Sequence, residues 1–117
     1  MESFFSSAGP APDAGARVKV MRWPARLRLD PATTLNGRAI QISSSGVSLL
    51  LPRSVREGER GLVRVDAFIS GNPVRLQASG NVVCCACVGM EGFRISMRFA
   101  SLDADALTAL DTLLHAR

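Results

Sequence analysis

The spacing of apolar and polar residues changes once along the chain. Before residue 101, apolar side chains alternate with polar ones in short runs, which is typical of half-buried β-strands. The clearest run is 93–99, with four apolar side chains on one face and three polar ones on the other. Beyond it, apolar residues recur every three or four positions, which predicts an amphipathic helix. These helical positions are Leu102, Ala106, Leu107, Leu110, Leu113 and Leu114.

Turn-forming residues divide the alternating part of the chain into strands. Asp30-Pro31 and Asn36-Gly37 predict the turn of a first hairpin, Pro52 ends a later strand, and Gly80-Asn81 predicts a bulge. The predicted strands cover 24–29, 38–42, 47–51, 61–69, 74–78, 82–88 and 93–99. The pattern therefore predicts an all-β fold with a C-terminal helix: a small six- to seven-stranded antiparallel β-barrel that the helix plugs or flanks.

The two cleanest apolar faces of the chain are expected to meet in the core. One belongs to the strand 93–99 and the other to the C-terminal helix, and Asp103 or Ser101 is expected to cap the start of that helix. The residues expected in this contact are Phe93, Ile95, Met97, Phe99, Leu107, Leu110 and Leu114.

The composition predicts one folded domain after a short leader. The chain has 117 residues, of which 47% are hydrophobic and 21% charged, a balance unlike that of disordered chains. Residues 1–16 are rich in Ala, Gly, Pro and Ser and are expected to form a flexible leader, with the domain at 17–117. A secretory signal pattern is missing and the apolar run 82–88 is too short to span a bilayer, so we expect a cytoplasmic protein without direct membrane insertion.

The residues that could carry catalysis are sparse. His115, the only histidine, lies near the C-terminus, where a cation complements the helix dipole. Cys84, Cys85 and Cys87 lack the spacing of a zinc knuckle and are expected to be small buried hydrophobes in a reducing compartment. Glu57 and Glu59 suit a solvated loop. We therefore expect neither an enzyme nor a metal site.

The basic residues carry the strongest hint of a ligand. Thirteen of the fourteen are arginine and only Lys19 is lysine. A guanidinium can grip phosphate and the O6/N7 edge of guanine through two hydrogen bonds, so this composition is compatible with a nucleotide-like partner. A codon bias toward arginine and alanine would produce the same composition.

Two short sequence motifs stand out: one contains two of these arginines and the other is rich in serine. Arg22 and Arg26 form an RxxxR pattern that begins ahead of the first predicted strand and ends inside it, and Gln41-Ile42-Ser43-Ser44-Ser45-Gly46 runs from the end of the second predicted strand into the turn before the third. In this order, and with the late strand and leucine-rich helix, the chain from about residue 17 to 116 resembles the PilZ domain family, the bacterial receptors for cyclic di-GMP. The family motifs are RxxxR and D/N-x-S-x-x-G.

The resemblance implies a ligand site for cyclic di-GMP and assigns residues to it. These are Arg17, Arg22, Arg26, Gln41, Ser43 and Gly46. Two registers of the arginine motif are open: one uses Arg22 and Arg26, and the other has Arg17 as second arginine and Asp13 in the place of the first. No cofactor besides the ligand is implied.

The resemblance also leaves two functions open. The first is an effector that binds cyclic di-GMP and regulates an unidentified protein partner in motility, pilus or exopolysaccharide systems. The second is a degenerate PilZ domain that no longer binds the nucleotide and serves as a protein–protein adaptor, because Gln41 replaces the family's Asp or Asn. A barrel for nucleic acid polymer is disfavoured, since Trp23 and five phenylalanines supply few stacking platforms.

Overall fold

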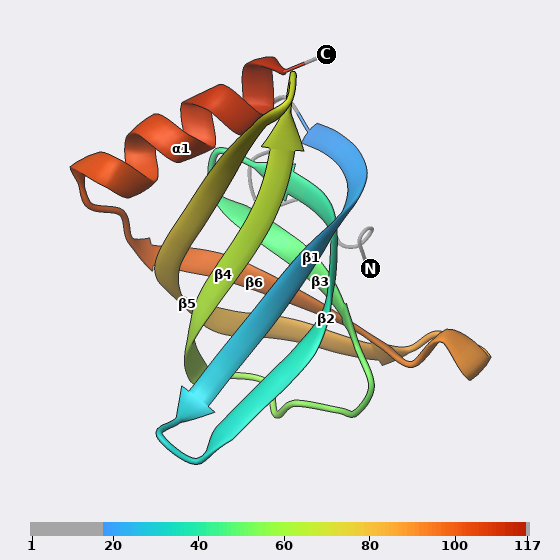
Figure 1. Cartoon of the computed structure of the whole chain (residues 1–117). Helices are drawn as coiled ribbons and strands as arrows, with labels where there is room; N and C mark the ends of the chain where they lie inside the picture. The colour runs from blue at the N-terminus through green and yellow to red at the C-terminus, as the bar shows by residue number, and fades with distance from the viewer. Residues whose placement is uncertain (1–17, 117) are drawn as a thin grey trace.

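The chain folds into a closed antiparallel barrel with one helix (Figure 1). The computed structural model describes residues 18–116. The elements are β1 (Val18–Asp30), β2 (Thr33–Ser43), β3 (Gly46–Leu51), β4 (Arg60–Ile69), β5 (Asn72–Cys87), the short 3-10 helix η1 (Gly89–Glu91), β6 (Phe93–Ser101) and α1 (Ala104–His115). The expected all-β fold with a C-terminal helix is confirmed, with six strands in the described part.

The strands follow the order β1-β2-β3-β6-β5-β4 around the barrel. Pairing of residues 25–28 of β1 with 62–65 of β4 closes it, and every neighbouring pair is antiparallel. The predicted strands 74–78 and 82–88 are parts of one long strand, β5. Its register against β6 shifts between Ser79 and Gly80 and between Val82 and Cys84, so the bulge expected near Gly80 is confirmed.

The first hairpin turns at the first of its two predicted turn sequences, Asp30-Pro31, and not at Asn36-Gly37. The turn lies at Pro31 and Ala32, and the Asp30 side chain accepts a hydrogen bond from the Ala32 amide at 2.8 Å. Gly37 lies inside β2, where a Cβ would stand 2.0 Å from the Leu50 carbonyl oxygen of β3. The glycine therefore permits close contact between two strands, and its turn-like sequence was misleading.

The barrel interior holds the inward apolar side chains of all six strands. Ile95 and Met97 of β6 are buried as expected, and Phe93 and Phe99 are partly buried against the same core. The largest fully buried side chains are Leu27, Ile42, Leu49, Leu51, Val63, Val65, Leu76, Val82, Ile95 and Leu113.

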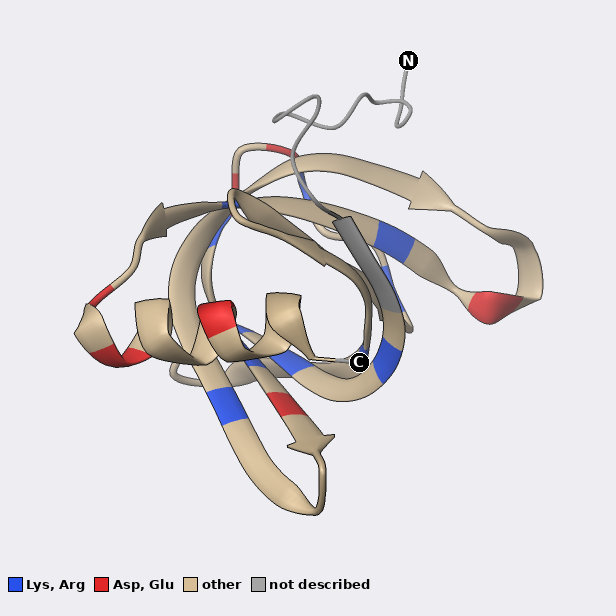
Figure 2. Ribbon diagram, turned by 90° about the horizontal axis from the view of Figure 1, so that it is seen from above, with Lys and Arg blue, Asp and Glu red and all other residues tan. Residues whose placement is uncertain are grey.

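Helix α1 packs against β5 and lies across one end of the barrel (Figures 1 and 2). Asp103 caps its N-terminus by accepting a hydrogen bond from the Ala106 amide at 2.8 Å.

The face that α1 buries differs in part from the predicted one. Its buried residues are Ala106, Ala109, Leu110 and Leu113. Leu107 is 53% exposed, so its expected place in the core was wrong. Successive residues of an α-helix are rotated by about 100° about its axis, so Leu107 lies away from the face centred on Ala106 and Leu113. Within residues 18–116, no helix has the length and apolar character needed to cross a membrane.

Candidate functional site

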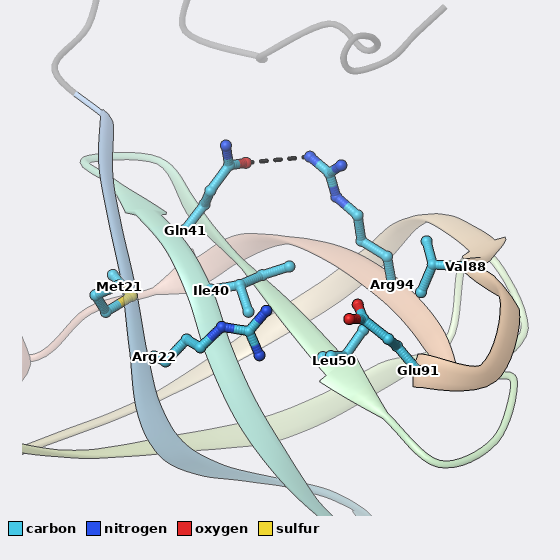
Figure 3. A pocket seen from close by; sticks show the side chains of 8 residues that line it. All are labelled: Met21, Arg22, Ile40, Gln41, Leu50, Val88, Glu91 and Arg94. Atoms are coloured by element: carbon cyan, nitrogen blue, oxygen red, sulfur yellow. Dashed lines mark hydrogen bonds between the residues drawn. The ribbon is translucent and has the colours of Figure 1, made fainter.

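A hollow of about 450 Å³ lies on the outer face of the barrel (Figure 3). One side is formed by β1, β2 and β3, and the other by the hairpin that joins β5 to β6 through η1. Its volume is within the usual range for small-molecule pockets. The lining residues are Met21, Arg22, Ile40, Gln41, Leu50, Val88, Glu91 and Arg94.

Irregular strand pairing explains why neighbours in sequence share this hollow. The register of β1 against β2 shifts between Val20 and Trp23, and that of β2 against β3 shifts between Ala39 and Gln41. Each shift interrupts the strict alternation of inward and outward side chains. As a result, Met21 and Arg22 both line the hollow, as do Ile40 and Gln41.

A hydrogen bond joins two residues of the polar lining. An Arg94 Nη2 group donates to Gln41 Oε1 at 3.2 Å, joining β6 to β2 (Figure 3). Because a guanidinium can only donate, this contact fixes the orientation of the Gln41 amide. Its oxygen faces Arg94, and its NH2 group faces away from Arg94.

The remaining polar groups stand at the edge of an apolar surface. Arg22 and Glu91 are exposed, and among residues 18–116 no hydrogen bond or ion pair engages either side chain. In Figure 3 they reach toward each other from β1 and η1, on either side of Ile40 and Leu50. The hollow thus combines two guanidinium groups, an amide and a carboxylate with an apolar floor, which suits an anionic ligand with flat rings.

The serine-rich turn adjoins the hollow without lining it. Ser43 is buried, and its Oγ accepts a hydrogen bond from the Ser45 amide at 3.3 Å. A Cβ on Gly46 would stand 2.2 Å from the Met97 carbonyl oxygen of β6. Gly46 is not among the described residues with positive φ. In this structure Ser43 therefore supports the turn, and Gly46 permits close contact between β3 and β6.

The arginines of the first motif are separated. Arg22 lines the hollow together with Gln41. Arg26, four residues further along β1, is exposed and pairs across the sheet with Asn36 and Arg64. At about 3.3 Å per residue, the two positions are roughly 13 Å apart. Arg17 and Asp13 lie outside the described residues.

Trp23 points toward the opposite side of β1 from Arg22. It is partly buried against the core and pairs with Ala39, whose side chain is fully buried. Trp23 does not line the hollow. It is therefore a reporter of barrel packing more than of this site.

Beside Arg26, the outer face carries a small ion-pair network. Asp66 accepts hydrogen bonds from Arg75 at 2.9 Å and from Arg64 at 3.1 Å. Desolvation by burial raises the pKa of Asp66, but these two hydrogen bonds and the charges of the arginines outweigh it and hold the pKa below its ordinary value of 3.8. Figure 2 shows how basic residues are spread over the barrel wall.

The cysteines are less buried than the sequence suggested. Cys84 and Cys85 are partly buried, while Cys87 is exposed because β5 continues past the core into the hairpin. The expectation that all three are buried hydrophobes was therefore wrong. Burial, with smaller contributions from Glu57 and Cys85, raises the pKa of the Cys84 thiol. The described residues contain no group of three or more His, Cys, Asp or Glu that could hold a metal ion.

Sequence reasoning missed the half of the hollow that comes from the β5–β6 hairpin. Arg94 is one of three polar positions in the alternation of β6, and Glu91 lies within the turn η1 that precedes this strand. The one available signal was the pair of glycines, Gly89 and Gly92, that brackets Glu91. Both have positive φ, so they mark a tight, defined turn.

Comparison with known proteins agrees with this architecture. The family model described as PilZ domain matches residues 14–116. A search of curated proteins finds no match.

Several solved structures share the fold. The Bacillus subtilis inhibitor of motility (MotI/DgrA) superposes with a TM-score of 0.69 at 11% identity, covering 86% of this chain and 49% of that one. This chain thus spans about half the length of that protein. The PilZ domain of YcgR from Escherichia coli, solved with c-di-GMP, gives a TM-score of 0.66 at 16% identity, covering 86% and 87%.

A third similar structure is the PilZ domain of CeSA from a cellulose-synthesizing bacterium. It gives a TM-score of 0.59 at 12% identity and covers 83% of this chain and 93% of that one. At these identities the structural likeness concerns the fold, whereas the family model covers almost the whole chain. The family suggested by the two motifs is confirmed, and the chain belongs to the PilZ domain family.

Proposed function

We propose that this protein is a cyclic di-GMP-binding effector that acts by binding, without catalysis, in the cytoplasm. The observation that carries the proposal is that Arg22 and Arg94 both line one hollow on the outer face, beside the β2 segment that holds the second family motif. The family is one of cyclic di-GMP receptors, and the similar PilZ domain of YcgR was solved with this nucleotide.

The chemistry of the hollow suits the nucleotide. Cyclic di-GMP offers two phosphates and two guanines. Guanidinium groups bind phosphate or the O6/N7 edge of guanine through paired hydrogen bonds, each good pair contributing roughly 1–3 kcal/mol. The apolar surface of Met21, Ile40 and Leu50 can cover a purine face. Bound nucleotide would reshape this side of the barrel, through which the protein would regulate a partner in motility, pilus or exopolysaccharide systems.

Calorimetric titration with cyclic di-GMP tests the proposal. We expect Arg22→Ala to weaken binding about 10- to 100-fold, because one forked contact is lost. Arg53→Ala, which removes an exposed arginine in the loop between β3 and β4, is the matched control and should bind normally. Gln41→Asp should strengthen binding by restoring a motif carboxylate.

The same titration resolves the arginine register. If Arg17→Ala is the more damaging variant, the site uses the register with Asp13. If Arg26→Ala is more damaging, the nucleotide extends along β1 beyond the hollow. We favour the first outcome because Arg26 does not line the hollow.

One observation favours the alternative, a degenerate PilZ domain that serves as a protein–protein adaptor. Gln41, which already departs from the motif, has its carbonyl oxygen engaged by Arg94. If titration with cyclic di-GMP at high micromolar concentration gives no heat of binding, the effector proposal fails and the adaptor proposal takes its place.

A further inference from the structure

We propose that Glu91, in the β5–β6 hairpin, supplies the carboxylate with which this hollow recognises guanine. In this arrangement Glu91 accepts hydrogen bonds from the N1–H and N2–H2 groups of one guanine. The inference rests on the proposed function and assigns to the hairpin a recognition role that the second motif does not fill in this chain.

The Gln41 side chain presents a single acceptor atom to a ligand. Its carbonyl oxygen already accepts a hydrogen bond from Arg94, and its amide nitrogen can only donate. Guanine presents two adjacent donors on its Watson–Crick edge, N1–H and N2–H2. Gln41 is therefore poorly suited to that edge unless the contact with Arg94 breaks.

Glu91 is an available acceptor in the same hollow. Glu91 is the carboxylate among the lining residues, it is exposed, and no hydrogen bond or ion pair within residues 18–116 engages it. Two oxygens on one carboxylate match two adjacent donors, and charge-assisted hydrogen bonds of this kind are stronger than neutral ones. Glu91 thus has the chemistry that position 41 lacks.

Backbone contacts of the hairpin place Glu91 against the end of β3. Val88 donates a backbone hydrogen bond to Gly92 at 2.9 Å, which closes the base of the hairpin. A Cβ on Gly92 would stand 2.4 Å from the Leu51 carbonyl oxygen, so the hairpin lies directly against the end of β3. This contact holds Glu91 beside Leu50, at the edge of the apolar floor (Figure 3).

The negative charge of Glu91 lies among positive charges in the hollow. A carboxylate near the phosphates of a cyclic dinucleotide would repel them, but Arg22 and Arg94 share the hollow and offset its charge. Adenine presents an acceptor at N1, which a carboxylate repels. The arrangement therefore predicts preference for guanine over adenine.

The test compares two nucleotides and two variants by calorimetry. Cyclic di-IMP lacks the N2 amine of guanine and is otherwise alike. We expect Glu91→Gln to weaken cyclic di-GMP binding about 10-fold or more, and to weaken cyclic di-IMP binding clearly less. Glu57→Gln makes the same charge change in an exposed loop and should leave both affinities unchanged. Thermal melts of both variants should match the parent, because both side chains are exposed.

The sign of the effect decides the outcome. If Glu91 only repels phosphate, Glu91→Gln will tighten binding of both nucleotides, and the inference is overturned. Equal losses for the two nucleotides, or no loss, overturn it as well while leaving the proposed function intact. If the parent protein binds neither nucleotide, the proposed function fails and the inference fails with it.

Discussion

Removal of the Leu113 side chain tests how α1 contributes to the barrel. Leu113 is fully buried, whereas Leu107, six residues earlier on the same helix, is 53% exposed. The pair Leu113→Ala and Leu107→Ala makes one chemical change in two environments. Any difference between them therefore reports packing against the barrel and not helix propensity.

The magnitude follows from the buried carbons. Leu→Ala removes three carbons at roughly 0.8 kcal/mol each, and the cavity left behind raises the total to about 3–5 kcal/mol for Leu113. For a domain of this size, such a loss lowers the melting temperature by roughly 10–20 °C. Leu107→Ala should cost less than roughly 1 kcal/mol, since the side chain is half in solvent and alanine favours helix.

The assay is urea unfolding followed by the emission of Trp23, which packs against the core. Chemical and thermal midpoints should both fall for Leu113→Ala and stay near the parent values for Leu107→Ala. Equal losses in the two variants, or a stable Leu113→Ala protein, would contradict the placement of α1 over the barrel end.

Three further predictions concern the wall of the barrel. Gly46→Ala should lower the free energy of unfolding by roughly 1–3 kcal/mol, measured by urea denaturation, because its Cβ would meet the Met97 carbonyl oxygen at 2.2 Å. Asp66→Asn should cost roughly 0.5–1 kcal/mol near neutral pH, as for exposed ion pairs. Because the folded pKa of Asp66 lies below 3.8, this stabilisation is complete above that value and is lost as the pH falls through the lowered pKa, so parent and variant should converge in acid. Iodoacetamide should modify Cys87 before Cys84, because Cys87 is exposed while burial raises the pKa of Cys84; fragment-ion mass spectrometry of the peptide that contains both would reveal a reversed order.

The regular parts of the fold follow from local patterns. The alternation in 93–99 predicted β6, and the apolar spacing after Leu102 predicted α1, because burial on one face imposes a period that the sequence displays directly. Asn36-Gly37 misled because glycine serves both in turns and where two strands approach closely. Only the position of Leu50 in the neighbouring strand distinguishes these uses.

The candidate site was less accessible to sequence reasoning. Arg22 and Gln41 could be proposed from the family motifs, but the contact between Gln41 and Arg94 joins residues 53 positions apart. It depends on β3 lying between β2 and β6 in the barrel, a topology that local patterns do not determine. Bulges in β1 and β2 also determine which side chains face the hollow, and no residue type in these strands indicates where the bulges lie.

The close approach of Gly46 to β6 affects how this motif is interpreted in other chains. Any side chain at that position would collide with the Met97 carbonyl oxygen, whether or not a nucleotide binds outside the barrel. Selection for a stable fold alone would then retain the glycine after ligand binding had been lost. A surviving glycine in this motif is consequently a sign of an intact barrel, and the diagnosis of a receptor has to come from the side chains that face outward.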